Sequence, residues 1–441
     1  MAEPLKLALA GLGTVGVGVL DLLQQNRALI EARAGRSVEV VAVSARDRSR
    51  DRGVDLSPYR WCDDPRELAE VEHADIVVEL VGGSDGPALE LARGALASGK
   101  GLVTANKAMI AHHGMELAGS AEQSGLPLKF EAAVAGGIPV VKGLREGAAA
   151  NAITRIYGIL NGTCNYILSE METTGANFAD VLAEAQAKGF AEADPTFDIE
   201  GVDAAHKLAI LAAIGFGAQL DFDGVACEGI SRIQSADIEQ ARALGYVIRL
   251  LGIADLDQVD GQADRLLQRV RPCLVPRGHP LAHVDGATNA VVAEGNFSGR
   301  LLFQGAGAGA GPTASAVVAD IVEIARGDTG APFSVPSARL QAMERAELGA
   351  RTGRSYMRFT VADRPGVLAE IAAAMRDAGV SIESLIQPAH PLENGGADGG
   401  EALIAMVAHK GREADAAKAL KQLEGSDSLT AKPLFMPILS N

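Results

Sequence analysis

LKLALAGLGTVGVGVLDLL, residues 5–23, is the stretch that decides the fold of the front of the chain. Its first six residues read as a buried strand, and the residues from Thr14 onward repeat their apolar positions with a helical period. Between strand and helix lies a G-x-G-x-x-G sequence, which is typical of a dinucleotide-binding βαβ unit. A glycine-rich turn in an unrelated α/β domain is the alternative. We expect the pyrophosphate to lie on this loop and helix N-terminus, at Gly11, Gly13, Thr14, Val15 and Gly16.

The second apolar run, Val38 to Val43, should end beside the adenosine ribose. An acid at that end would bind both ribose hydroxyls and select NAD. The chain instead continues as SARDRSR, which is basic apart from Asp47. Arg46 is therefore expected to meet a 2′-phosphate, which favours NADP. Arg48 and the next arginine are equally well explained as solvated loop residues.

Two more strands are expected to complete the parallel sheet of the front. DIVVELV begins at Asp75, and a helix is expected over Pro87 to Ala97. The short strand 102–104 then delivers Thr104 and Lys107 to the carboxyl edge of the sheet, where ligands of open α/β sheets bind. Both residues are expected near the cofactor, with Lys107 facing the nicotinamide. A surface lysine at a strand end is the alternative.

KGFAEADPTFDIEGVDAAHKLAIL, residues 188–211, places an acid and an amine on an apolar helix. Asp203 and Lys207 are four residues apart and share one face, while Glu192 lies in the preceding loop. Burying such charges is costly unless they are paired or used. The set is therefore either a structural ion pair or a site that holds an amino-acid substrate and moves its proton. His206 points to another face, where packing is its expected role.

Two other turns offer ligand groups. EAAVAGGIP begins at Glu131, and an acid followed by a flexible turn presents a carboxylate and free carbonyls to a hard cation. NGT, residues 161–163, ends an apolar strand and opens a helix, a position suited to a substrate carboxylate, so Thr163 is expected at the substrate.

Composition excludes several classes of function. With 441 residues the chain is long enough for two or three domains, and its 48% hydrophobic residues and 51 glycines fit an α/β enzyme. A net charge of −16 argues against a nucleic-acid partner. The four cysteines have no metal-ligand or disulfide spacing, and no stretch has the length of a membrane span or the form of a signal peptide. We therefore expect a cytoplasmic protein without a membrane partner.

Taken together, the motifs resemble the homoserine dehydrogenase family over essentially the whole chain. The matching pieces follow the family's order, which makes the resemblance specific: GLGTVG, TANK ending at Lys107, EAAVAGGIP, NGT, KGFAEADP with DAAHK, and GAGAGAGPTASAVVAD near Gly305. The resemblance implies NADP- or NAD-dependent interconversion of L-homoserine and L-aspartate 4-semialdehyde in threonine, methionine and isoleucine biosynthesis. A catalytically inactive amino-acid sensor, or another NAD(P) amino-aldehyde oxidoreductase, is the alternative.

The resemblance also implies roles for single residues. Lys207 matches the lysine that exchanges a proton with the substrate hydroxyl, Asp203 and Glu192 match the acids that hold homoserine, and Lys107 matches the lysine near the nicotinamide. The cofactor also meets the loop at Gly305. A structural sodium or potassium ion is implied at Glu131, Val134, Gly136 and Ile138. Two departures are Phe190, where the family usually has Tyr, and Ala193, where Pro is frequent.

The tail has the pattern of a small regulatory module. A strand at Tyr356 to Val361, a Asp-Arg-Pro-Gly-Val turn from Asp363 and an amphipathic helix are followed by two more strands around a turn at 394–396, then a helix. This pattern resembles an ACT domain, which implies threonine as an effector. A dimerisation module without a ligand is the alternative.

The predicted fold class is α/β in three parts. An N-terminal Rossmann-type parallel sheet spans residues 1–131, with 305–340 returning to it. An α+β catalytic and dimerisation domain spans 132–304, and a C-terminal ACT-like ferredoxin-type domain spans 355–430. A homodimer or homotetramer is expected.

Overall fold

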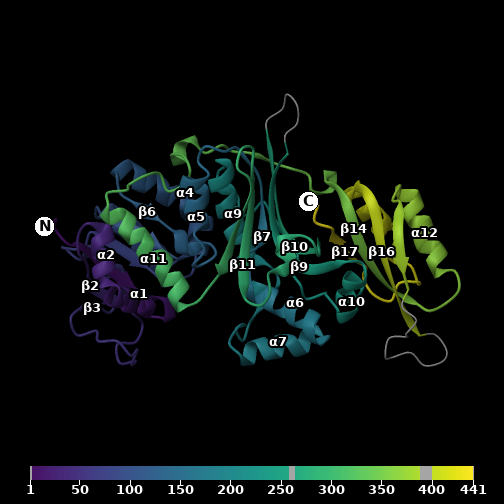
Figure 1. The fold of residues 1–441 in the computed structure, drawn as a ribbon, viewed down its shortest axis with the longest axis horizontal. Helices are drawn as coiled ribbons and strands as arrows, with labels where there is room; N and C mark the ends of the chain where they lie inside the picture. Colours follow the sequence, from purple (N-terminus) through teal and green to yellow (C-terminus); the bar gives the residue numbers. More distant parts are fainter. Residues whose placement is uncertain (1, 258–263, 388–399, 441) are drawn as a thin grey trace.

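Three sheets stand in a row along the computed structural model, which describes residues 2–257, 264–387 and 400–440 (Figure 1). The first is a six-stranded parallel sheet in the order β3-β2-β1-β4-β5-β6, which confirms the predicted Rossmann-type topology. Its strands are β1 (Leu5–Ala10), β2 (Val38–Ser44), β3 (Arg60–Cys62), β4 (Ile76–Glu79), β5 (Gly101–Thr104) and β6 (Leu128–Lys129). The strand order reverses direction between β1 and β4, so the crevice for a dinucleotide lies at their carboxyl ends.

Helices cover both faces of this sheet, and one of them comes from far along the chain. The helices that follow its strands are α1 (Thr14–Gln25), α2 (Arg27–Ala34), α3 (Pro87–Ala97) and α4 (Lys107–Ser124). Helix α11 (Ala310–Ala325) returns to lie beside α1 (Figure 1). The two helices approach so closely that a Cβ on Gly18 would lie 2.9 Å from the carbonyl oxygen of Ala310. The glycine-rich approach to α11 is thereby held at the dinucleotide crevice.

The middle sheet is largely antiparallel, in the order β12-β11-β7-β9-β10-β13, with β8 also paired to β10. Its strands are β7 (Ile153–Ile159), β8 (Val225–Cys227), β9 (Tyr246–Asp257), β10 (Arg265–Pro276), β11 (Thr288–Gly295), β12 (Gly299–Ala306) and β13 (Glu344–Arg345). The helices of this part are α5 (Val140–Lys142), α6 (Gly162–Thr174), α7 (Phe178–Ala187), α8 (Thr196–Ile199), α9 (Val202–Phe216) and α10 (Ser235–Ala243).

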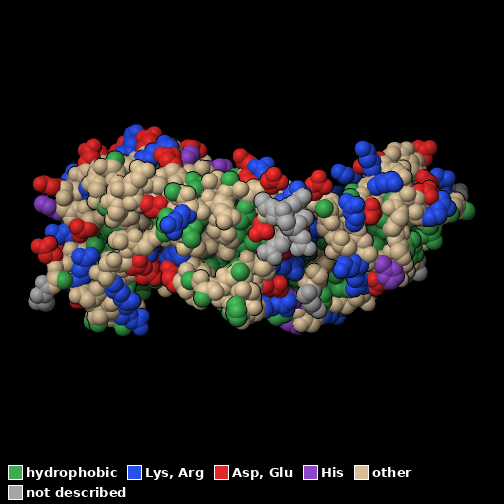
Figure 2. All heavy atoms as spheres, turned by 90° about the horizontal axis from the view of Figure 1, so that it is seen from above, with side chains coloured by type: hydrophobic (Ala, Val, Ile, Leu, Met, Phe, Trp, Pro, Cys, Tyr) green, Lys and Arg blue, Asp and Glu red, His purple; other side chains and the backbone are tan. Residues whose placement is uncertain are grey.

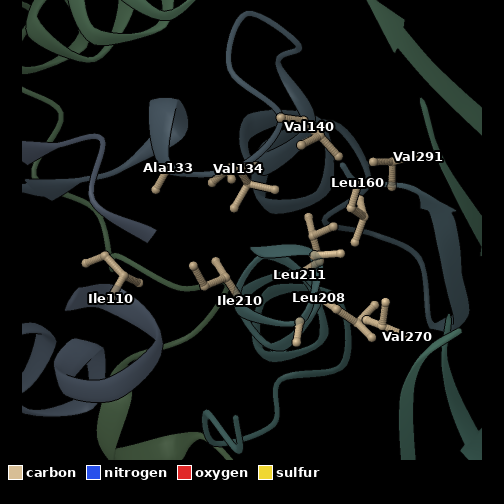
Figure 3. Close-up of a cluster of buried hydrophobic side chains, with 14 of the residues drawn as sticks. Ile110, Ala133, Val134, Val140, Leu160, Leu208, Ile210, Leu211, Val270 and Val291 are labelled. Atoms are coloured by element: carbon tan, nitrogen blue, oxygen red, sulfur yellow. The ribbon is translucent and has the colours of Figure 1, made fainter. Parts of the chain in front are cut away.

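Helix α9 is buried along most of its length, as its apolar sequence predicts. Figure 3 shows its side chains directed to different neighbours, with Ile210 toward Ile110 of α4 and Leu208 toward Val270 of β10. Each fully buried side chain of this size stabilises the fold by roughly 1.5–3 kcal/mol. The helix therefore joins the first sheet to the second, and any side chain at its N-terminus has a fixed position.

The third sheet has the order β15-β16-β14-β17, with helices α12 (Val367–Ala378) and α13 (Glu413–Leu423). Its strands are β14 (Thr352–Ala362), β15 (Ile382–Ile386), β16 (Glu401–Arg412) and β17 (Leu434–Pro437). This is the predicted ferredoxin-type arrangement. The prediction omitted β17, which pairs with β14 as the outer strand beside the middle sheet. The turn predicted at 394–396 lies outside the described residues.

Short one-turn segments complete the described chain. They are η1 (Pro65–Glu70), η2 (Glu131–Ala133), η3 (Gly143–Gly147), η4 (Pro280–His283), η5 (Ser337–Arg339) and η6 (Leu348–Ala350). Within the described ranges, no helix has the length and hydropathy to cross a membrane. On the face seen in Figure 2, basic and acidic side chains are interspersed rather than gathered into a basic patch.

Candidate active site

The G-x-G-x-x-G loop lies between β1 and α1 with the geometry that a pyrophosphate requires. Gly11 has φ +95°, and a Cβ on it would lie 2.5 Å from the carbonyl oxygen of Leu80, so only glycine fits there. Gly13 is the N-cap of α1 and supplies no side-chain cap. The first N–H groups of α1, including those of Thr14 and Val15, are therefore free for an anion.

The end of β2 is basic, as its sequence indicates. Arg46 is exposed two residues beyond the strand. Arg52, which sequence reasoning did not select, donates from Nε to the carbonyl oxygen of Leu12 at 3.1 Å, within the glycine loop. Its Nη2 also donates to the carbonyl oxygen of Asp47 at 2.6 Å. These contacts hold the arginine-bearing loop against the dinucleotide crevice.

Lys107 is the first residue of α4, and the Asn106 side chain caps this helix by accepting from the N–H of Met109 at 3.0 Å. The Lys107 side chain extends from α4 to α9, where its Nζ lies 3.0 Å from Oδ1 of Asp203. Two predicted site residues, one at the start of α4 and one in α9, therefore meet.

Asp203 is the centre of the buried charge cluster, with 4% of its surface exposed against 8% for Lys207. Its Oδ2 accepts hydrogen bonds from Lys207 Nζ at 2.7 Å and from Asn161 Nδ2 at 2.9 Å. Burial alone would raise the pKa of this carboxyl, but the two lysine ammonium groups and the hydrogen bonds hold it below its ordinary value. Asp203 is thus a fixed anion between two cations.

Lys207 has one donor left for a substrate. Its Nζ also donates to the carbonyl oxygen of Leu160 at 2.8 Å. An ammonium group has three N–H donors, and Asp203 and Leu160 take two. Since the Lys207 side chain lines a cleft, the third N–H is available to a bound oxygen.

Asp198 is a site residue that sequence reasoning missed. It accepts from Asn161 Nδ2 at 2.8 Å and from Thr163 Oγ1 at 3.2 Å. Burial and the neighbouring Asp203 raise its pKa above the ordinary value, against the hydrogen bonds from Asn161 and Thr163. Asp198 lies in the same stretch, 188–211, as Glu192. Its helix α8 has only four residues, which is too few for a repeat of apolar positions to predict where the side chain points.

A cleft of about 590 Å³ joins these groups to the dinucleotide loop. Predicted residues that line it are Val15, Lys107, Gly136, Thr163, Glu192, Asp203 and Lys207. Glu192 is exposed. The cleft is also lined by Asn161, Asp198 and Asn289. Of these three, only Asn161 belongs to a motif predicted to meet the substrate, the NGT turn. Asn289 is buried and donates to the carbonyl oxygen of Leu160 at 2.9 Å.

Gly305 and Thr104, two further predicted cofactor residues, do not line the cleft themselves. Gly305 is in β12 and pairs with Asn289 of β11. The loop that follows it contributes the lining residues Gly307 and Gly309. Thr104 is buried at the end of β5, below the lining residues Ala105 and Lys107.

The rings of Phe190 and His206 each stack on another aromatic ring. Phe190, which replaces the family's usual Tyr, stacks on Tyr166 with ring centroids 4.6 Å apart and lines the cleft. His206 is absent from the cleft wall and stacks on Phe222 with ring centroids 4.3 Å apart. The packing role predicted for His206 agrees with this position.

The loop after Glu131 has the features of a cation site. The Glu131 carboxylate is buried, accepts from the N–H groups of Val141 and Lys142, and has a pKa raised to about 7 by burial and by Asp320. Ala135 has φ +56°, which a non-glycine residue rarely adopts. Among the described residues, the carbonyls of Val134 and Gly136 accept no hydrogen bond.

The carbonyl of Ile138 accepts from the N–H of Val140 at 2.7 Å and keeps one lone pair. Buried carbonyls without partners beside a buried carboxylate are the ligands that a sodium or potassium ion takes. The donor set therefore fits the implied ion.

Comparison with known proteins was made for the whole chain. The model of the family "Homoserine dehydrogenase" matches residues 139–322, the model "Homoserine dehydrogenase, NAD binding domain" matches 11–131, and the model "ACT domain" matches 355–425. A homoserine dehydrogenase of Pseudomonas aeruginosa is 45% identical over 434 residues, covering 96% of each chain.

Solved structures agree with these matches. A homoserine dehydrogenase from Thiobacillus denitrificans has a TM-score of 0.91 and 41% identity, covering 99% of each chain. A hyperthermophilic archaeal homoserine dehydrogenase in complex with NADPH has a TM-score of 0.61 and 26% identity, and covers 73% of this chain and 97% of its own.

Proposed function

The chain belongs to the homoserine dehydrogenase family, and on that premise we propose which of its side chains hold the substrate and move the proton. Its reaction is the NAD(P)-dependent interconversion of L-homoserine and L-aspartate 4-semialdehyde, a step of amino-acid biosynthesis. The alternatives, an inactive sensor and an oxidoreductase for another amino aldehyde, are not favoured by these full-length matches.

The observation that carries the assignment of roles is the bridging of Lys107 and Lys207 by Asp203 at the floor of the cleft. A nicotinamide dinucleotide held by the loop and helix N-terminus at Gly11, Gly13, Thr14 and Val15 would supply the hydride chemistry. During reduction the Lys207 ammonium donates the proton of its third N–H to the carbonyl oxygen of the aldehyde and becomes a neutral amine, and during oxidation the neutral amine takes the hydroxyl proton. Lys107 adds a second positive charge that favours the developing alkoxide.

The substrate ammonium is assigned to Asp198 and Glu192. Asp203 was predicted to hold homoserine, and its oxygens accept from both lysines and Asn161, which leaves Oδ1 one lone pair for the substrate ammonium. Its proposed share in binding is to fix the lysines and to add negative charge near the amine. A bound ammonium would stabilise the charged form of Asp198, which burial disfavours, as its raised pKa indicates. The N–H groups at the start of α6, beside Thr163, face the substrate carboxylate.

Comparison of homoserine with 4-hydroxybutanoate, which lacks the amino group, tests this assignment. The wild type should prefer homoserine in kcat/KM by roughly 10²-fold or more, and Asp198→Asn should lose most of that preference. Asp180→Asn, an exposed N-terminal residue of α7, is the control. Equal preference for homoserine in the wild type and in Asp198→Asn would contradict the role of Asp198.

For the cofactor, we propose NADP as at least an equal of NAD. Arg46 beyond β2 and the absence of an acid at that strand end support this choice, as does the NADPH in the archaeal relative's complex. For the cation, we propose sodium or potassium on Glu131, Val134, Gly136 and Ile138. Replacing both salts with tetramethylammonium chloride should lower the thermal midpoint, and an unchanged midpoint would contradict the site.

The ACT domain is proposed to bind threonine. Gly366 has φ +100° and caps α12 without a side-chain hydrogen bond, so the first N–H groups of α12 are free for a carboxylate. Asp363 stands beside this turn and suits the ammonium. ACT modules commonly pair, so a homodimer or homotetramer is proposed as the assembly, and the reducing cytoplasm as the location of its four free cysteines.

For the domain boundaries, we propose 1–131 with 305–340 returning, 132–304, and a third domain from 355. The pairing of β17 with β14 supports extending this third domain past 430 to the end of the described chain.

A further inference from the structure

A buried carboxylate outside the cleft connects the two loops that approach the cofactor. Glu79 is the last residue of β4 and is fully buried. It is absent from the cleft wall, which begins one layer above it with Ala105 and Lys107. From sequence, DIVVELV was interpreted as a buried strand, and Glu79 had no predicted role. A buried carboxylate is costly unless hydrogen bonds satisfy it, so its partners indicate its role.

Three donors from two loops converge on Glu79. Its Oε1 accepts from the N–H of Val81 at 2.7 Å and from the N–H of Gly82 at 3.0 Å. Its Oε2 accepts from Thr104 Oγ1 at 2.6 Å. The first two bonds fold the turn after β4, and the third ties that turn to the end of β5. The carboxylate is therefore a fixed connection between neighbouring strand ends.

The connection continues to Lys107 through Thr104 and Asn106. Thr104 Oγ1 accepts from the N–H of Asn106 at 3.0 Å while it donates to Glu79. The Asn106 amide donates to the carbonyl oxygen of Gly83 at 2.7 Å, and its oxygen caps α4. Lys107 is the next residue. A single chain of hydrogen bonds thus runs from Glu79 to the start of the helix that carries Lys107.

The same turn also borders the glycine loop. The carbonyl oxygen of Leu80, the residue after Glu79, lies 2.5 Å from the place a Cβ on Gly11 would occupy. A change in the Glu79 turn would therefore move the floor beneath the dinucleotide as well as Lys107. We propose that Glu79 is a positioning residue of the reaction, whose carboxylate holds the dinucleotide loop and Lys107 in register through Thr104 and Asn106.

The donor pattern gives this proposal a specific direction. Thr104 gives its one hydroxyl hydrogen to Glu79 and accepts from the N–H of Asn106 with a lone pair. In Glu79→Gln the amide oxygen can still accept from the two backbone N–H groups, but the amide nitrogen then faces Thr104 as a donor. The Thr104 hydroxyl is left without an acceptor in a buried position, and the chain to Asn106 is disturbed.

Steady-state kinetics with both substrates test the proposal. Glu79→Gln and Thr104→Val should each raise KM for the nicotinamide cofactor and lower kcat, by roughly tenfold for each parameter, while KM for homoserine changes by less than about twofold. The double variant should be no worse than the worse single variant, because both break the same chain. Thr104→Ser, which keeps the hydroxyl, should recover most of the loss of Thr104→Val.

Glu122→Gln is the matched control. Glu122 is near the other end of α4, and its carboxylate also accepts from a backbone N–H and a hydroxyl, both of Ser337. It should lose thermal stability without a change in KM for the cofactor. A purely structural Glu79 would behave in the same way, with fewer folded molecules and an unchanged cofactor KM. That result, or additive losses in the double variant, would overturn the proposal.

Discussion

Among single residues, Asp203 has the central place, because its carboxylate neutralises two lysine ammonium groups that would each be costly to bury alone in these apolar surroundings. One carboxylate bridges two ammonium groups, and Asn161 supplies a further hydrogen bond. Removing one member of such a buried set leaves the others uncompensated, which costs more than a surface ion pair contributes. Removing one member is therefore expected to lower the stability of the protein, and in the proposed reaction the proton on Lys207 would move beside the fixed charges of Asp203 and Lys107.

His206, next to this cluster, gives a prediction about pH. Burial and the neighbouring His112 lower its pKa from 6.5 to about 4. The folded protein therefore binds this proton less well than the unfolded chain does, and stability falls as pH decreases below 6.5. This group alone should cost about 2 kcal/mol of unfolding free energy between about pH 7.5 and about pH 5. Urea unfolding at the two pH values measures the loss.

His206→Gln should reduce the pH dependence of the urea midpoint, because glutamine does not titrate. His73→Gln, an exposed residue, should leave it as in the wild type. Wild type and His206→Gln with the same midpoint shift would show that His206 is not held neutral by its surroundings.

Sequence predicts the central residues where spacing fixes geometry. The four-residue spacing of Asp203 and Lys207 on an apolar helix was sufficient to place them on one face, and the 2.7 Å contact agrees. Lys107 was placed at a strand end but not against Asp203, because that contact joins two helices that are far apart in the sequence. Asp198 was missed for a related reason, since its direction depends on hydrogen bonds to Asn161 and Thr163.

At the scale of the element, strand and helix periods predicted most of the described fold. Helix α3 begins and ends at the residues expected from its pattern. Strand β17 was not expected, because four residues that end in Pro437 have no period of their own and are strand only through pairing with β14. Helix α6 begins at Gly162, earlier than its apolar run suggests, because Asn161 caps it.

The loop that follows β2 carries the prediction about cofactor choice. Arg46→Ala should lower the NADP/NAD ratio of kcat/KM by roughly tenfold, as expected for the loss of one charge-assisted contact to a phosphate. Arg33→Ala, in α2 away from the strand end, is a control of the same charge change. Steady-state kinetics with both cofactors measure the ratio, and an unchanged ratio in Arg46→Ala would show that this side chain does not meet the 2′-phosphate.

At the scale of the whole molecule, buried ionic contacts join the ACT domain to the middle sheet. Arg269 of β10 donates to the Glu413 carboxylate at 2.8 Å, and the buried Asp237 of α10 accepts from Tyr356 of β14 at 3.1 Å. Arg358 Nε lies 3.3 Å from the same Asp237 carboxylate. Sequence cannot predict such pairs between distant positions, and under the proposed regulation they would connect the ACT domain to the catalytic sheet.

Threonine should therefore inhibit the full chain at millimolar concentration, which requires tighter binding to the inactive arrangement by roughly 1–3 kcal/mol. Asp363→Ala should remain active but lose inhibition, whereas Asp377→Ala, exposed at the far end of α12, should keep it. A chain that ends near Gly353 should be active and insensitive. The archaeal relative that covers 73% of this chain supports an independent catalytic part. A full chain that millimolar threonine does not inhibit would contradict the regulatory role and leave the catalytic assignment standing.

The role of Lys207 is tested most directly by the rate of homoserine oxidation by Lys207→Ala, with NADPH binding measured by fluorescence on the same sample. We expect kcat to fall by roughly 10²-fold or more while cofactor affinity stays within about twofold, because the proposed task of the lysine is to move the proton and not to hold the dinucleotide. Added methylamine should restore part of the rate, and Lys188→Ala, an exposed lysine of the same region, should not lose it. Turnover of Lys207→Ala close to that of the wild type across the pH range would contradict the assignment of proton transfer to this lysine.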